Sequence, residues 1–222
     1  PDDYLMVYER LLTQARQPVI IHWLGEMFDP ALAGYWGYSQ IDEALKAVTA
    51  LLRAHATRID GIKISLLDKT KEIALRRELP ASVRMYTGDD FDFAELIGGD
   101  ALGYSDALLG IFDAIAPAAS AALSELASGR RDRFDEILAP CVPLSRHIFS
   151  APTQFYKTGI VFMAWLNGYQ KEFVMLGGQE TKRSLPHLAE IFRLAVRARL
   201  LQDPELAFTR MDTLCRTEGI TV

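Results

Sequence analysis

The sequence predicts an α/β fold, a (β/α)8 barrel to which this chain contributes four βα units and a helical extension. Three observations predict it. Short apolar runs alternate with segments of helical periodicity over residues 1–128. The pattern is then helical almost to the end. No G-x-G-x-x-G follows a strand-like run and no G-x-x-x-x-G-K-[ST] occurs, so the doubly wound nucleotide-binding fold, which has the same rhythm, loses its usual support.

Each element of the first half follows from a local signal. Apolar residues recur at helical spacing at positions 5, 7, 8, 11 and 12, and Pro18 ends this helix before the apolar run VIIHWL, which is typical of a buried parallel strand. Ser39 is the expected cap of the next helix, and Gly98 closes a short one. We therefore predict helices at residues 4–16, 39–58, 69–78 and 91–97, and strands at residues 19–24, 59–67, 83–87 and 107–112.

The second half is punctuated by glycine and proline rather than by strands. Its predicted helices are residues 118–128, 131–149, 155–167 and 186–201, with a final short helix in the tail 203–222. This pattern predicts two regions, four βα units in residues 1–128 and a helical extension in residues 129–222.

Composition excludes several classes of protein. The 222 residues are 50% hydrophobic and 24% charged, as in a globular chain with a sizeable core. A net charge of −5 provides no basic surface for nucleic acid, and no run approaches the ~20 apolar residues of a membrane-spanning helix. Cys141 and Cys215 are far apart and have no histidine at metal-ligand spacing. We expect a cytoplasmic protein without nucleic acid or membrane partners.

Lys63 is the leading catalytic candidate. It lies in the short apolar run GIKIS at residues 61–65. A lysine buried in a strand loses solvation, so it either pairs with an acid or has a lowered pKa suited to amine chemistry. The alternative is an ion pair with Asp89 or Asp90, without any chemistry.

Four motifs in order resemble the dihydrodipicolinate synthase and N-acetylneuraminate lyase superfamily of class I aldolases, and within it a dihydrodipicolinate synthase-like bacterial branch. GIK at 61–63 is similar to the family's sixth strand with its Schiff-base lysine. TGDD at 87–90 is similar to the end of the seventh strand, and DALLGI at 106–111 with AIAP at 114–117 to the eighth strand and its helix.

The resemblance implies a TIM barrel of the class I aldolase type, with this chain covering strands 5–8 and the C-terminal helices. It also implies a homo-oligomer and an imine between Lys63 and a small oxo compound, chemistry that needs no metal or organic cofactor. His22 takes the place of the family's proton-relaying tyrosine, a role that histidine can perform. The implied substrate-binding residues are Thr87, Gly88, Asp89, Leu109 and Gly110.

The chain departs from the family at two points. The arginine that binds the substrate carboxylate has no counterpart near Met27, and the Gly-Thr-Thr motif of the second strand belongs to a segment outside this chain. These departures argue against pyruvate as the substrate. Because four βα units cannot close a barrel and the chain begins at Pro1, we expect a truncated polypeptide, or else another copy or segment that completes the barrel.

Other functions stay open on the residues alone. A barrel without the aldolase reaction would serve as a binding or scaffold protein. Metal-assisted chemistry would use His22, Glu26 and Asp89 as ligands. Asp89 or Asp90 could instead cap the helix that follows. The aromatic loop at residues 25–38 is either a lid over the substrate or packed against a neighbouring subunit.

Overall fold

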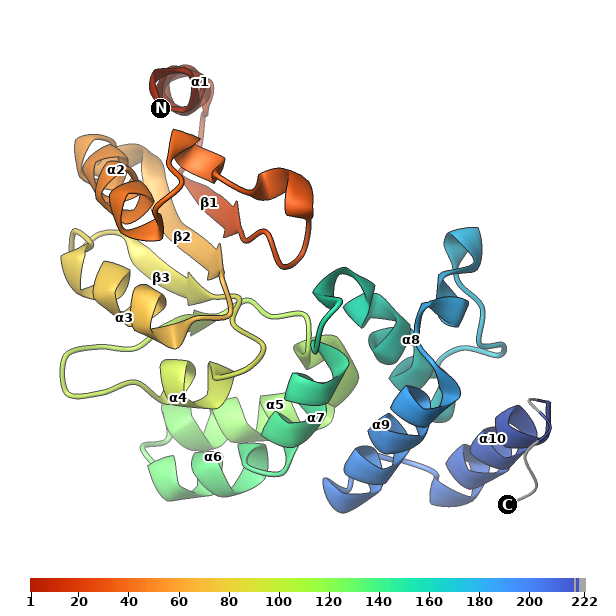
Figure 1. Ribbon diagram of the computed structural model, residues 1–222. Coiled ribbons are helices and arrows are strands. Elements are labelled where there is room, and N and C mark those ends of the chain that lie inside the picture. Colours follow the sequence, from red (N-terminus) through yellow and green to blue (C-terminus); the bar gives the residue numbers. More distant parts are fainter. Residues whose placement is uncertain (218, 220–222) are drawn as a thin grey trace. The chain divides into compact units, whose positions relative to one another are not determined.

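The computed structural model describes residues 1–217 and residue 219, and it shows an α/β protein (Figure 1). The chain divides into two compact units, Pro1–Leu109 and Gly110–Val222. The first unit carries a parallel sheet, and the described part of the second is helical. The sequence predicted a boundary after residue 128. In the structure the helix at residues 112–127 already belongs to the second unit.

Four parallel strands in the order β1-β2-β3-β4 form the sheet of the first unit. The predicted strand at residues 19–24 and the predicted helix at residues 69–78 are confirmed. In chain order the elements are α1 (Asp2–Gln14), β1 (Val19–Leu24), the 3-10 helices Pro30–Leu32 and Tyr35–Gly37, α2 (Ile41–Ala54), the 3-10 helix Ala56–Arg58, β2 (Ile59–Ser65), α3 (Lys69–Glu78), β3 (Arg84–Thr87), α4 (Phe93–Gly98) and β4 (Asp106–Ala107).

The prediction of a (β/α)8 barrel, with this chain as its C-terminal half, is wrong. The described strands form an open parallel sheet with β1 and β4 at its edges, and β4 has only two residues. Alternation of strands and helices specifies parallel pairing and short-range crossovers. Closure depends on strand number, tilt and stagger, which the local pattern does not contain.

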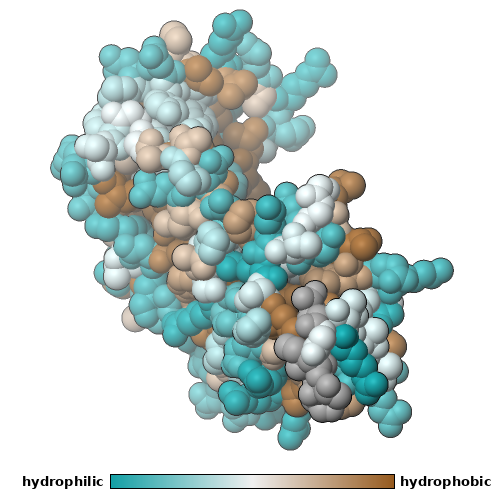
Figure 2. Space-filling view, turned by 45° about the vertical axis from the view of Figure 1, so that its right-hand side comes forward, coloured by the Kyte–Doolittle hydropathy of each residue, from teal (hydrophilic) through white to brown (hydrophobic). Residues whose placement is uncertain are grey.

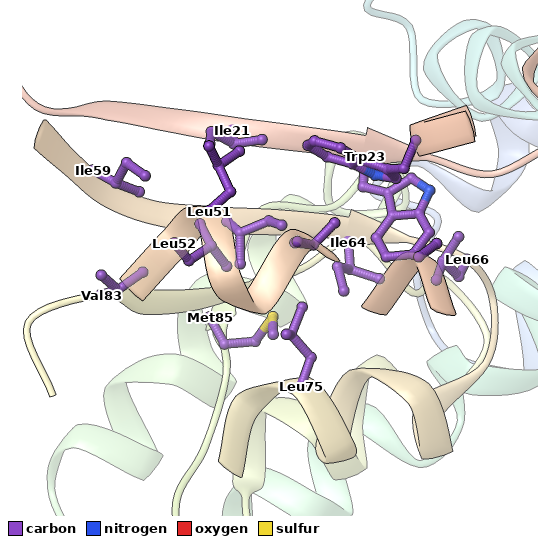
Figure 3. Packing of buried hydrophobic residues seen from close by; sticks show 14 of the residues in the cluster. Ile21, Trp23, Leu51, Leu52, Ile59, Ile64, Leu66, Leu75, Val83 and Met85 are labelled. Atoms are coloured by element: carbon purple, nitrogen blue, oxygen red, sulfur yellow. The ribbon is translucent and has the colours of Figure 1, made fainter. Parts of the chain in front are cut away.

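The two faces of the sheet differ in character, because side chains alternate along each strand. Ile21, Ile62 and Met85 are register neighbours on one face, where they meet the apolar stripes of α2 and α3. Figure 3 shows Leu51 and Leu52 of α2 packed against this face. VIIHWL therefore forms a strand buried on one face rather than on both, and Ile20 on the other face is 44% exposed.

Local capping explains where some helices begin. The Asp68 side chain accepts hydrogen bonds from the backbone N–H groups of Thr70 and Lys71, and α3 starts there. Ser39, the predicted cap of α2, is not its N-cap; this position is Gln40, which makes no side-chain capping bond. Helix α2 is stabilised by tertiary packing instead, because its apolar face with Ala44, Val48 and Leu51 is buried in the core.

The aromatic loop packs into the core of its own unit. Trp36 is 1% exposed and has a left-handed backbone conformation, with φ of 73°. Its ring stacks on Tyr8 of α1 at 4.6 Å and meets Trp23 of β1 edge to face at 6.0 Å. These contacts anchor the loop by aromatic packing, so the centre of the loop is not a free lid.

The second unit differs from the prediction where proline interrupts a helix. One helix was expected at residues 131–149, but two form, since proline at position 140 cannot continue α6 and is instead the N-cap of α7. The run expected as a strand up to residue 112 pairs only at Asp106–Ala107. The described helices are α5 (Phe112–Ala127), α6 (Arg131–Leu138), α7 (Cys141–Ile148), the 3-10 helix Thr153–Phe155, α8 (Tyr156–Leu166), the 3-10 helix Leu176–Lys182, α9 (Leu185–Arg197) and α10 (Pro204–Thr217).

Apolar side chains also reach the surface. Figure 2 shows hydrophobic residues among hydrophilic ones on the face that it presents, and the large exposed side chains include Leu102 of the first unit and Leu176 of the second. Within the described part of the chain, none of the helices combines the length and apolar character needed to cross a membrane. The predicted tail helix is present as α10, and residues 218 and 220–222 lie outside the description.

Candidate active site around Lys63

His22 and Lys63 are direct neighbours across β1 and β2. Tyr86 of β3 is the register neighbour of Lys63 on its other side, so the three side chains form one row across the sheet. This row lies on the face opposite the hydrophobic core. The structure therefore brings together the two residues that the sequence singled out for catalysis, and adds a tyrosine.

Lys63 is half-buried, and its surroundings favour the uncharged amine. Loss of solvation lowers the pKa of the Lys63 ammonium below its ordinary value, while the negative charge of Asp90 acts in the opposite direction and is the weaker effect. Asp90 itself is 2% exposed. The charge of Asp90, one of the two alternative ion-pair partners, therefore does not cancel the effect of desolvation on the pKa of Lys63.

His22 is held by a serine at the end of the neighbouring strand. Its Nε2 lies 3.0 Å from the Oγ of Ser65, and the tautomer of the imidazole decides which atom donates. Desolvation, with a further contribution from the charge of Lys63, lowers the pKa of His22 from 6.5 to about 4. The imidazole is therefore neutral near pH 7, and it can accept a proton there.

Gly88 makes room for both side chains. A Cβ atom at this position would collide with Ser65 Oγ and lie 2.7 Å from Lys63 Cε. The Gly88 N–H donates to the Ile64 carbonyl at 2.7 Å, which holds the loop against β2. The glycine was expected to allow a close approach to a ligand; in the structure it allows the close approach of Lys63 and Ser65.

Thr87 belongs to the opposite face of the sheet. It is the register neighbour of Ile64 and is fully buried. Its hydroxyl donates to the carboxyl group of Glu72 on α3, which also accepts from Ser105 at 2.7 Å. Burial raises the pKa of Glu72 to about 7, although the two hydrogen bonds oppose this shift. Thr87 is predicted to bind substrate, but the structure gives it a place in a buried polar network.

Asp89 caps the turn before α4. It is 1% exposed, and its Oδ1 accepts hydrogen bonds from the backbone N–H groups of Phe91 and Asp92 at 2.8 and 2.9 Å. Burial raises the pKa of this carboxyl group despite these bonds. The capping alternative thus accounts for the contacts of Asp89.

Leu109 and Gly110 fall on the two sides of the boundary between the units. Leu109 is the last residue of the first unit, and Gly110 is the first of the second. Within the second unit Gly110 lies against the rings of Phe149 and Tyr156, since a Cβ there would be 3.0 Å and 3.2 Å from them. Its small size serves this packing.

The sequence did not reveal two residues that bond to this row, namely Ser65, the partner of His22, and Asp60, the partner of Tyr86. Ser65 follows Lys63 by two positions and so shares its face, a signal that strand alternation contains. The Tyr86 hydroxyl donates to Asp60 Oδ2 at 2.5 Å, and Arg84 Nη2 donates to Asp60 Oδ1 at 2.5 Å. Desolvation and this hydrogen bond raise the pKa of Tyr86 to about 12, so its hydroxyl stays protonated. These pairings have no local signature, because the residues come from two strands.

The predicted metal ligands do not converge. Among the described residues, no group of three or more His, Cys, Asp and Glu side chains is placed to hold a metal ion. His22 is bonded to Ser65, while Asp89 is bonded to backbone groups of its own turn. The set of His22, Glu26 and Asp89 is therefore not assembled.

Comparison with known proteins identifies a family without indicating an activity. Residues 1–220 match the sequence profile described as "Protein of unknown function (DUF993)". The search of curated proteins found no match. Since the profile covers nearly the whole sequence, this chain belongs to the DUF993 family.

Proposed function

We propose that the protein is a lyase of the aldolase type, in which Lys63 forms an imine with a small oxo compound for cleavage or formation of a C–C bond. The supporting observation is the pairing of Lys63 with His22 across adjacent strands, with the pKa of each lowered by its surroundings. A half-buried lysine with a lowered pKa is the usual form of an amine nucleophile.

The chemistry needs only the amine and a group that transfers protons. The Lys63 Nζ forms a bond to the carbonyl carbon, and one of its protons passes to a base. The carbonyl oxygen takes up this proton and a second one from solvent and leaves as water, which completes the protonated imine. The protonated imine then accepts the electron pair of the breaking C–C bond, and reprotonation and hydrolysis return the free lysine.

His22 is the proposed proton carrier. It is neutral near pH 7 and lies beside Lys63, so it can take the proton that the attacking amine loses and return it to the departing oxygen. Ser65 orients the imidazole through the hydrogen bond to Nε2. With 3% of its surface exposed, Ser65 is a positioning residue rather than a nucleophile.

The proposed substrate is an aldehyde or ketone. Arg84 shares the face of Lys63, but its guanidinium pairs with Asp60 and lies over the Tyr86 ring. It is thus engaged rather than free to bind the carboxylate of a 2-oxo acid. The lack of a free arginine for a substrate carboxylate also favours a second candidate function, in which the aldolase reaction is lost and the chain binds a ligand without converting it.

Borohydride trapping tests the proposal. The protein is incubated with a panel of aldehydes, ketones and 2-oxo acids, reduced, digested and analysed by peptide mass spectrometry. The expected result is a substrate-dependent mass increment on the Lys63 peptide that is lost in Lys63→Met. Lys46→Met, which removes an exposed lysine of α2, is the matched control and keeps the increment.

Labelling of Lys63 that is no faster than labelling of Lys46 with every carbonyl compound would contradict the proposal and favour the binding function. The predicted homo-oligomer and the cytoplasmic location remain predictions that rest on the resemblance and the composition.

A further inference from the structure

We infer that the first unit contains a second small-molecule site, a cavity that takes an organic cation with an apolar body. The cavity has a volume of about 230 Å³ and lies where β1 and β2 end, between the loop after β1 and the first turns of α2 and α3. Clefts at the carboxyl ends of parallel strands are common ligand sites in α/β proteins.

This cavity is distinct from the site around Lys63. Its lining includes Trp23 and Leu66, which lie together beside the start of α2 and α3 in Figure 3. Trp23 belongs to the core face of the sheet, whereas the neighbouring His22 belongs to the face of Lys63. Neither His22 nor Lys63 lines the cavity, so the two sites lie on opposite faces of one sheet.

Aromatic and apolar side chains form most of the wall. Tyr35 and Tyr38 of the loop face it together with Trp23, and Ile41 and Ala44 of α2 contribute the aliphatic part. The Tyr35 hydroxyl is engaged by Tyr8 at 2.9 Å, which fixes that ring in place. Such a wall suits a compact apolar body, and aromatic faces attract cations.

The charged side chains around the cavity give it a net negative charge. The only lysine of the lining, Lys71, donates to Asp42 Oδ1 at 2.6 Å. Asp68 also lines the cavity, with its Oδ1 used to cap α3. Glu26 is exposed, and no described residue makes a hydrogen bond or ion pair with its carboxylate.

A ligand that satisfies this lining carries a positive charge beside Glu26 and an apolar group against Trp23 and the tyrosines. A primary amine on a short aromatic or aliphatic body has this chemistry. A carboxylate would instead meet Glu26 and Asp68, since the ammonium of Lys71 is already neutralised by Asp42.

Isothermal titration calorimetry with 2-phenylethylamine tests the inference, with 3-phenylpropionate as the probe of opposite charge. We expect saturable binding of the amine with one site per chain, and binding of the carboxylate at least tenfold weaker. Glu26→Gln removes the charge at an exposed position and is expected to weaken amine binding about tenfold. The matched control Glu43→Gln, on the exposed first turn of α2 outside the lining, leaves it unchanged.

Two further variants separate this site from Lys63 and test its position. Lys63→Met leaves amine binding unchanged, so failure of the imine proposal and failure of this inference are distinguishable. Ala44→Leu fills the cavity wall and is expected to abolish binding, with thermal melting as the check of folding. Absence of amine binding, equal binding of the carboxylate, or an unchanged affinity in Glu26→Gln would overturn the inference.

Discussion

The side chain of Lys63 passes over the backbone of Gly88, where a Cβ atom would lie 2.7 Å from Lys63 Cε. Ser65 approaches the same position from the end of β2. The geometry of the candidate site therefore depends on the absence of a methyl group at position 88.

Gly88→Ala is expected to reduce imine trapping on Lys63 at least tenfold, because the new methyl group must displace Lys63 and Ser65. Overpacking of this kind also lowers the free energy of unfolding by about 1–3 kcal/mol. Trapping yield and urea denaturation measure the two effects. Gly129→Ala is the control: it strains a glycine with φ of 74° but meets no atom within 4 Å, and it should leave trapping intact. Trapping in Gly88→Ala equal to that of the wild type would refute the steric argument.

Lys63 should react as a free amine at lower pH than an exposed lysine. Desolvation lowers the pKa of Lys63, whereas the hydrogen bond to Glu43 raises the pKa of Lys46. Competitive reductive methylation across a pH series, read by peptide mass spectrometry, is expected to give a midpoint for Lys63 below 10.5 and one for Lys46 above it. Midpoints in the reverse order would show that Lys63 is held as the ammonium ion.

Lys63→Met should raise the pKa of His22 from about 4 toward its ordinary value. The charge of Lys63 disfavours the imidazolium, so its removal makes protonation easier. Desolvation is the larger cause and persists, so the pKa should stay below 6.5. Histidine NMR titration measures this change. His55 at the C-terminal end of α2, whose Nε2 lies 3.9 Å from a carboxylate oxygen of Glu9, serves as the internal reference.

Glu72 should make the protein less stable as the pH rises. Its pKa is raised by burial from 4.5 to about 7, so the folded state binds the proton more tightly than the unfolded state. This contribution to the free energy of unfolding is complete below pH 4.5 and is lost as the pH rises through 7. The loss is on the order of 3 kcal/mol. Urea denaturation is expected to show a free energy of unfolding that falls between pH 5 and 8.

Glu72→Gln provides the matched test of that slope. The amide keeps an acceptor for Ser105 and a donor that can face Thr87 Oγ1, but it does not ionise. The difference in unfolding free energy between pH 5 and 8 should therefore shrink in this variant, and it should persist in the exposed control Glu43→Gln. An unchanged slope in Glu72→Gln would assign the pH dependence to other groups.

The sequence predicted those elements of the first unit that depend on a few neighbouring residues. Proline at position 18 and the run VIIHWL marked β1, and the helical pattern of residues 69–78 marked α3. The strand expected to reach residue 112 was wrong, because an apolar run is equally compatible with a buried helical start. Pairing with a neighbour, rather than composition, decides where a strand ends.

The candidate site was predicted in part. Lys63 and His22 could be selected because a lysine and a histidine stand out inside apolar runs, and parallel register placed them side by side. The hydrogen bonds of Ser65, and those that join Tyr86 and Arg84 to Asp60, were not predicted, since each joins residues of different strands. The cavity beside Trp23 likewise arises from three segments separated along the chain.

By itself the sequence determined the α/β class, the order of strands and helices in the first unit, and the residue types available for amine chemistry. These depend on periodicity, capping and side-chain chemistry over a few neighbouring residues. Tertiary structure alone decided that the sheet is open, that only one face of β1 is buried, and that Thr87 faces Glu72 while Lys63 faces His22. The physical reason is that burial, strand register and pKa depend on atoms brought together from distant parts of the chain, which no local pattern specifies.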